Sequence, residues 1–210
     1  MTTKVQPQDR TVTVNNGLNN EMKLHYLDWG NQDAPHILLL HGLRGHAHSW
    51  DDVLQALCQD FHVLALDQRG RGDSDWAGDG DYSGAAYLAD LLGFCDTLSL
   101  DSFFLVGHSM GGRNSLAFAG RHSRRLQKLV IVDAPPANMP SGPRIRQEMI
   151  NVPEEFDTFE DVYNHLRKDN PLPPEEVLRR RLKYQTKVLP NGKYGWKYDL
   201  AVREGFRKGT

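Results

Sequence analysis

Hydrophobic and polar positions follow two different patterns along the first part of this 210-residue chain. Residues 11–14 and 22–29 alternate between apolar and polar side chains, which is typical of strands with one buried face. The stretch NNGLNN lies between them and contains an Asn-Gly step, so it predicts a turn. Four later runs are short and continuously apolar, as expected for strands covered on both faces: 36–40, 62–66, 103–106 and 129–132.

Apolar residues at helical spacing separate these runs. They predict helices over residues 49–59, 82–98 and 110–122. Strands that alternate with helices through short connections are typical of a parallel sheet with helices on both of its faces. Together with the leading hairpin, the pattern predicts an α/β fold whose sheet begins antiparallel and continues parallel.

The pattern changes after Asp133. A proline-rich stretch marks a boundary, and charged segments beyond it predict helices over 144–150, 159–167, 174–184 and 199–206. Pro190-Asn191-Gly192 predicts a hairpin within residues 187–198. No run typical of a buried parallel strand follows residue 133. We therefore predict a core over residues 1–136 and a helical lid with a hairpin over residues 137–210.

Composition and charge narrow the class of protein. The net charge of −2 gives no reason to expect nucleic acid or an anionic membrane as a partner. The longest apolar runs are shorter than the roughly 18 residues that span a bilayer, and the first residues lack the apolar segment of a signal peptide. Cys58 and Cys95 lie in apolar helical contexts with no Cys/His cluster, so we expect reduced core thiols, no metal site and a cytoplasmic protein.

The stretch FFLVGHSMGGRNSLAFA, residues 103–119, carries the chemistry. Gly107, Ser109 and Gly111 form the pattern G-x-S-x-G, between a predicted strand and a predicted helix. In such an elbow the serine adopts a strained backbone, and a side chain at either glycine would clash. We therefore predict that Ser109 is a nucleophile. The alternative is a tight turn whose serine caps the helix.

Two more glycine-containing stretches follow predicted strands. In LLLHGLRG, residues 38–45, the backbone N–H of Leu43 is the expected partner of the Met110 N–H in an oxyanion hole. The alternative is an ordinary glycine turn. In LALDQRGRGDSDW, residues 64–76, we interpret Asp67, Arg69 and Ser74 as scaffold residues that hold the loop through hydrogen bonds and charge pairs.

The stretches HGLRGHAHSW, DQRGRGDSDW, GHSMGG and LVIVDAPP, in this order, resemble the α/β-hydrolase superfamily. The similarity extends to its lid-bearing esterase and carbon–carbon bond hydrolase branch. It implies about six of the usual eight strands, a small-molecule ester, lactone or vinylogous diketone substrate, a Ser-His-acid triad and no cofactor. Haloalkane dehalogenases and epoxide hydrolases of the superfamily have aspartate at the position of Ser109, so the resemblance does not favour their chemistry.

None of the nine histidines matches the family's catalytic histidine, which follows the last strand of the core. His165 follows the serine at a distance that would allow it to fold back, but its helical context predicts a solvent-facing side chain. The family resemblance therefore predicts that the catalytic histidine lies on a C-terminal segment beyond these 210 residues. The alternative, from another class, is an inactive family member that binds a small ligand or partner.

The acid of the triad has one candidate. Asp133 ends the predicted strand 129–132, at the sheet edge where sites gather in open α/β folds. The alternative is an aspartate that caps the proline-rich loop. Four residues of the predicted lid are candidates either for lining the site or for packing within the lid: Met149, Phe156, Tyr194 and Trp196.

Overall fold

The computed structural model describes residues 5–15, 21–135 and 142–208. The predicted turn between the first two strands falls on residues 16–20 and lies outside the described residues. The chain divides into two compact units, residues 1–139 and residues 140–210. That the second unit acts as a lid stays a prediction.

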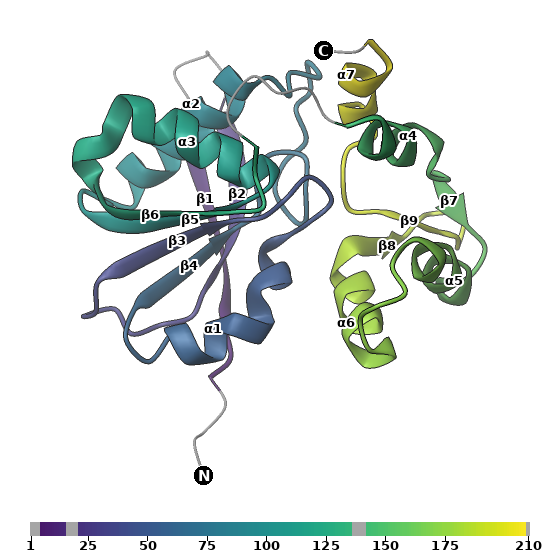
Figure 1. The fold of residues 1–210 in the computed structure, drawn as a ribbon, viewed down its shortest axis with the longest axis horizontal. Helices are drawn as coiled ribbons and strands as arrows, with labels where there is room; N and C mark the ends of the chain where they lie inside the picture. Colours follow the sequence, from purple (N-terminus) through teal and green to yellow (C-terminus); the bar gives the residue numbers. More distant parts are fainter. Residues whose placement is uncertain (1–4, 16–20, 136–141, 209–210) are drawn as a thin grey trace. The chain divides into compact units, whose positions relative to one another are not determined.

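The first unit contains a six-stranded sheet in the order β1-β2-β4-β3-β5-β6 (Figure 1). Its strands are β1 Gln8–Asn15, β2 Glu21–Asp28, β3 His36–Leu40, β4 His62–Leu66, β5 Phe103–His108 and β6 Leu126–Val132. Strand β2 is antiparallel to both β1 and β4, whereas β4, β3, β5 and β6 are parallel to one another. The predicted α/β fold, with a sheet that begins antiparallel and continues parallel, is confirmed.

Helices cover both faces of this sheet, which explains the continuously apolar strands. The helices are α1 Asp51–Leu57, α2 Gly84–Thr97 and α3 Met110–His122, and two 3-10 turns, η1 Ala47–Trp50 and η2 Ser123–Arg125, adjoin them. In Figure 1, α1 lies on one face while α2 and α3 lie on the other. Leu54 and Cys58 belong to the apolar core on the α1 face, and Phe94, Cys95 and Phe118 belong to the core on the opposite face. Both cysteines are buried free thiols, as predicted.

Strand β6 differs from the other three parallel strands. It is the last strand of the sheet in the described residues. Its Leu129 packs against the core under α3, but Val130 and Val132 on its other face are 49% and 41% exposed. The apolar run 129–132 is therefore covered on one face only within this part of the chain.

The second unit combines helices with a small antiparallel sheet. Its elements are α4 Pro143–Asn151, β7 Glu155–Phe156, α5 Phe159–Asp169, α6 Glu175–Gln185, β8 Thr186–Val188, β9 Tyr194–Trp196 and α7 Val202–Lys208. The predicted hairpin is formed by β8 and β9, and Gly192 adopts φ +81° in its turn. The sequence pattern did not predict β7, a two-residue strand that pairs with β9. No helix in the described residues of either unit has the length and apolar character needed to cross a membrane.

Three of the four candidate lining residues are buried. Met149, Phe156 and Trp196 are 1%, 9% and 4% exposed, respectively. The rings of Phe156 and Trp196 pack edge to face, with centroids 5.5 Å apart, and the Trp196 indole N–H donates to Pro153 O at 2.7 Å. Their burial fits the packing alternative. Tyr194 is partly buried, and its ring packs against that of Phe159.

Candidate active site

Ser109 lies in a strained turn between β5 and α3. Its φ of 50° and ψ of −112° fall outside the regions that L-residues ordinarily occupy, which costs of order 1–3 kcal/mol. The turn is held on both sides: the Ser109 N–H donates to Val132 O at 2.9 Å, and its carbonyl accepts from Arg113 N at 3.0 Å. The Ser109 side chain makes no cap hydrogen bond to helix α3. The hydroxyl is therefore not used to stabilise the helix.

The glycines around Ser109 are required by close packing. A Cβ on Gly107 would lie 2.4 Å from Gly111 O, and a Cβ on Gly111 would lie 2.3 Å from Leu40 O. Both contacts are with backbone atoms, which cannot move aside as the end of a flexible side chain can. A Cβ on Gly112 would meet the Ala134 Cβ at 2.6 Å. These distances give the predicted G-x-S-x-G spacing a steric cause.

The backbone N–H groups at the start of α3 have different partners. The Gly111 N–H donates to His41 O at 3.2 Å, and the Ser109 N–H donates to Val132 O. Met110 is the first residue of the helix, where N–H groups have no acceptor within the helix. The positive end of the helix dipole lies at the same place, so an anion beside Met110 N is favoured.

Leu43 lies in a tight turn beside Ser109. The turn is closed by the Gly45 N–H, which donates to Gly42 O at 2.9 Å. A Cβ on Gly42 would lie 3.4 Å from the Ser109 Cβ and 2.7 Å from Nδ1 of His108. Gly42 therefore lets its backbone approach the serine closely, and the adjoining Leu43 N–H belongs to the same peptide unit as Gly42 O.

His41 holds that peptide unit in place. Its Nδ1 lies 2.8 Å from Gly42 O, and its Nε2 lies 3.0 Å from the backbone nitrogen of Gln68. Because the Gln68 N–H can only donate and Gly42 O can only accept, Nε2 is the acceptor and Nδ1 carries the proton. Complete burial lowers the pKa of His41 from 6.5 to about 4, so the ring is neutral at pH 7. Both ring nitrogens are in use, and His41 cannot act as the base for Ser109.

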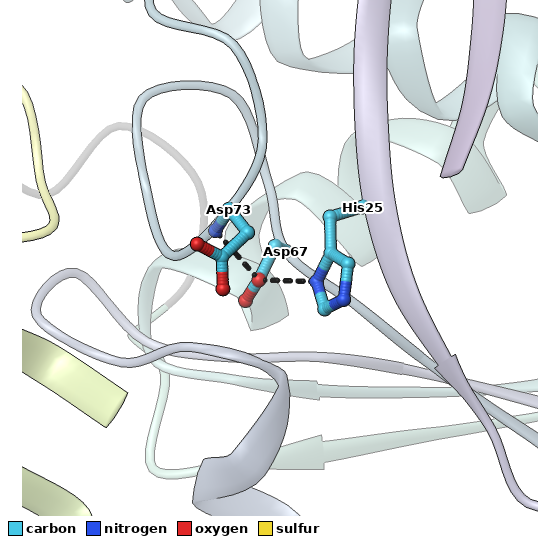
Figure 2. A group of neighbouring side chains, drawn as sticks. All are labelled: His25, Asp67 and Asp73. Carbon is cyan, nitrogen blue, oxygen red and sulfur yellow. Dashed lines mark hydrogen bonds and ion pairs between the residues drawn. The ribbon is translucent and has the colours of Figure 1, made fainter. Parts of the chain in front are cut away.

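Asp67 braces the loop that follows β4 (Figure 2). One carboxylate oxygen lies 2.7 Å from His25 Nδ1 and 3.0 Å from the Asp73 backbone N–H, while the other accepts from Ala47 N at 2.6 Å. Burial alone would raise the pKa of Asp67, but the hydrogen bond with His25 and the nearby positive charge lower it. Burial alone would likewise lower the pKa of His25, but Asp67 raises it. The contact between the two side chains therefore favours the charged form of each.

His25, Asp67 and Asp73 are also the group of possible metal ligands in the described residues, with ligand atoms within 4.8 Å of one another. Both oxygens of Asp67 already accept hydrogen bonds from the protein. His25 Nε2 lies 3.1 Å from a carboxylate oxygen of Asp9, so both ring nitrogens of His25 are engaged as well. The group thus acts as a hydrogen-bonded brace between β2 and the loop (Figure 2).

The other predicted scaffold residues make the expected contacts. Ser74 accepts from the His25 N–H at 2.8 Å and donates to Asp67 O at 2.5 Å. Arg69 forms a buried bidentate pair with Asp90 of α2, with its Nη2 2.6 Å from Oδ1. The interpretation of Asp67, Arg69 and Ser74 as residues that tie the loop down is confirmed by these hydrogen bonds and charge pairs.

Asp133 follows β6 directly and has a left-handed backbone, with φ of 47°. The residue is exposed, and the preceding residue, Val132, accepts the N–H of Ser109. A non-glycine residue in this conformation at the end of a sheet is unusual. The structure therefore places Asp133 directly after the strand adjacent to the elbow, next to the residue that Ser109 contacts.

None of the histidines hydrogen-bonds to Ser109 in the part of the chain that the structure describes. Several have carboxylate partners: His25 pairs with Asp67, His48 with Asp51, and His62 with Asp28. The ring of His122 packs on Phe118 within α3. His165 was expected to face solvent, but it is partly buried, and its ring centroid lies 5.4 Å from that of Phe156. The expectation failed because helix α5 turns this position toward the core of the second unit.

Residues 35–188 match the family model described as alpha/beta hydrolase fold, which covers more than half of the chain. The chain belongs to the α/β-hydrolase family. Among curated relatives of this chain, the N-formylmaleamate deformylase of Pseudomonas putida is 39% identical over 116 residues, 55% of this chain and 43% of the relative. An esterase of Mycobacterium tuberculosis is 30% identical over 183 residues, 84% of this chain and 60% of the relative.

Solved structures agree with this family. An α/β hydrolase from Novosphingobium aromaticivorans superposes with a TM-score of 0.83 at 26% identity, covering 97% of this chain and 72% of the other. The chain spans about half the length of the curated relatives that it matches, with 43%, 60% and 50% of three of them covered.

Reasoning from the sequence missed two parts of this candidate site. The first is a buried polar chain in which Asn114 Nδ2 donates to Gln68 Oε1 at 2.7 Å and Gln68 Nε2 donates to His41 O at 2.8 Å. The second is Arg71, whose contacts are described below. The signal for Arg71 was its position between two glycines in the quoted loop motif, but that motif does not show where the side chain points.

Proposed function

We propose that this α/β hydrolase is a serine hydrolase that cleaves an ester, lactone or related carbonyl substrate through an acyl-enzyme at Ser109. The observation that carries the proposal is the strained backbone of Ser109 combined with a hydroxyl that makes no cap hydrogen bond. Strain of this kind persists where the surroundings enforce it, and it clusters at functional sites. A serine that only ended a turn would gain nothing from it.

In the proposed mechanism, Ser109 Oγ attacks the substrate carbonyl and the oxygen becomes an oxyanion. The N–H groups of Leu43 and Met110 stabilise this oxygen, each by about 3–4 kcal/mol. The Met110 N–H is provided by the helix start, and the Leu43 N–H by the turn that His41 holds. Collapse of the oxyanion breaks the bond to the leaving alcohol, which takes up the proton that the base removed from Ser109, and leaves the acyl-enzyme. Water, deprotonated by the same base, then attacks the acyl carbon, and the acid is released as Ser109 Oγ regains its proton. The named activities of the relatives, a deformylase and an esterase, also proceed at a carbonyl carbon.

The general base is part of the proposal. Serine is a weak nucleophile and needs a base, normally a histidine held by a carboxylate. Because no histidine of the described residues bonds to Ser109, we place the catalytic histidine on a part of the full-length protein beyond these 210 residues. Relatives that extend well past the matched region support this placement.

Asp133 is the proposed acid. Its left-handed backbone is a second strained position next to the elbow, and the preceding Val132 contacts Ser109. If Asp133 orients the histidine, Asp133→Asn will lower kcat by about 10⁴-fold, the loss known for a triad aspartate. Asp101→Asn is the matched control, because Asp101 is exposed and precedes the opposite end of β5. If kcat of Asp133→Asn stays within threefold of wild type, Asp133 is not the catalytic acid, and the alternative of an aspartate that caps the proline-rich loop is favoured.

The decisive experiment uses the full-length protein, a panel of p-nitrophenyl esters and a fluorophosphonate probe. We expect the probe to label Ser109, as read by peptide mass spectrometry. Ser109→Ala should abolish labelling and lower turnover at least about 10³-fold. Ser123→Ala, at an exposed serine after α3, is the control and should label normally. Turnover that survives Ser109→Ala contradicts the mechanism, and ligand-induced stabilisation without labelling favours a non-catalytic binding protein.

A further inference from the structure

Arg71 is a fully buried arginine in the loop after β4. It is 1% exposed and follows Gly70, whose φ is +71°. Among the described residues, no carboxylate lies within salt-bridge distance of its guanidinium. Its neighbour Arg69 differs sharply, because Arg69 is paired with Asp90 at 2.5–2.6 Å. Burying a guanidinium without a direct ion pair lowers the stability of the folded protein, so an arginine at this position calls for an explanation other than stability.

The guanidinium of Arg71 reaches both residues that we propose for the oxyanion hole. Its Nε donates to Leu43 O at 3.2 Å, and its Nη2 donates to the Met110 Sδ at 3.6 Å. Leu43 is separated from Arg71 by 28 positions in the chain and Met110 by 39. One side chain thus joins the turn after β3 to the first residue of α3.

Contacts with three further residues hold the guanidinium at this place. Its Nη1 donates to Arg69 O at 2.9 Å and to the hydroxyl of Tyr87. The guanidinium carbon lies 5.4 Å from the ring centroid of Tyr82 and 5.6 Å from that of Tyr87. Aromatic rings at such distances attract a cation and partly replace the missing carboxylate. The side chain is therefore oriented before any substrate arrives.

We propose that Arg71 is a positioning residue that sets the spacing of the Leu43 and Met110 N–H groups and places positive charge beside the oxyanion. This inference rests on the proposed function. Arg71 restrains the two residues through its hydrogen bonds to the Leu43 carbonyl and to the Met110 sulfur. A rigid pair of donors lowers the transition state more than the ground state, because reorganisation is avoided when charge develops. A carboxylate partner would cancel the charge, and Arg71 has none within ion-pair distance in the described structure.

The test measures the full-length protein with p-nitrophenyl butyrate, a fluorophosphonate and n-butylboronic acid, which forms a tetrahedral adduct with serine. The variants are Arg71→Lys, which keeps the charge but loses the fork of donors, and Arg71→Met, which loses both. Tyr87→Phe removes one partner of the guanidinium and keeps the buried ring. Arg69→Lys is the matched control in the same loop.

We expect kcat and the affinity for the boronic acid to fall together, by roughly 10-fold to 100-fold in Arg71→Met and less in Arg71→Lys, with KM within about twofold. Arg69→Lys should lower the Tm without this joint loss. A folded Arg71→Met with kcat and boronate affinity within threefold of wild type overturns the inference. If both Arg71 variants fail to fold, Tyr87→Phe decides: a joint loss of at least threefold supports the role, and unchanged values overturn it.

The same measurements on wild type and Ser109→Ala separate this inference from the proposed function. If Ser109→Ala is inactive and Arg71→Met is normal, only the role of Arg71 is wrong. If Ser109→Ala keeps its turnover, or wild type shows neither turnover nor phosphonylation, the proposed function fails and the role of Arg71 fails with it.

Discussion

The neutral state of buried His41 predicts a specific loss of stability in acid. Burial lowers its pKa from 6.5 to about 4, so the unfolded chain binds a proton near pH 6.5 that the folded protein does not bind until near pH 4. The free energy of unfolding is therefore insensitive to His41 above pH 6.5 and falls as the pH drops below it. The two pKa values give a loss of about 2 kcal/mol between pH 7.5 and pH 5.

The assay is urea denaturation followed by tryptophan fluorescence at several pH values between 7.5 and 5. In His41→Asn the side-chain amide can still donate to Gly42 O but cannot titrate. This variant should be less stable than wild type at pH 7.5, because the buried N–H of Gln68 loses its acceptor, at a cost of about 1–3 kcal/mol. Its stability should then change by about 2 kcal/mol less than that of wild type on acidification.

Other histidines make the single-site comparison necessary. Burial also lowers the pKa of His36, which acts in the same direction, whereas Asp67 raises the pKa of His25. The contribution of His25 changes above pH 6.5 and is fully present below it. His122→Asn, a partly exposed position at the end of α3, serves as the control. If wild type and His41→Asn lose equal free energy between pH 7.5 and pH 5, or if the His41 ring titrates near pH 6.5 by NMR, the reasoning is refuted.

Two further predictions concern packing and charge around the site. Gly111→Ala should lower the free energy of unfolding by about 3 kcal/mol or more, because the new Cβ would lie 2.3 Å from Leu40 O. Gly120→Ala in the same helix meets no atom within 4 Å and should raise it by about 0.5–1 kcal/mol, so equal effects in urea denaturation would contradict the steric argument. Asp90→Asn should cost about 3–5 kcal/mol by leaving Arg69 buried without its partner, and an unchanged Tm would show that the loop tolerates an unpaired Arg69.

Local sequence patterns were sufficient to predict the strands and helices of the first unit and the serine elbow. The apolar runs at 36–40, 62–66 and 103–106 became strands β3, β4 and β5 because continuous apolar sequence is stable only where both faces are covered. Strand β6 was also predicted, but its partial exposure depends on its place at the end of the sheet order. The bounds of the first helix were predicted less accurately. The prediction was a single helix over 49–59, but the structure has a 3-10 turn at Ala47–Trp50 followed by α1 at Asp51–Leu57.

The sequence by itself thus determined the α/β class and the serine between its glycines, because periodicity and short-range spacing act between residues close in the chain. Tertiary structure alone decided the neutral tautomer of His41, set by Gln68, and the contacts of Arg71 with Leu43 and Met110. These contacts join residues 27 to 39 positions apart. They exist because parallel strands bring the loops at their carboxyl ends together, and no local pattern encodes which side chains then meet.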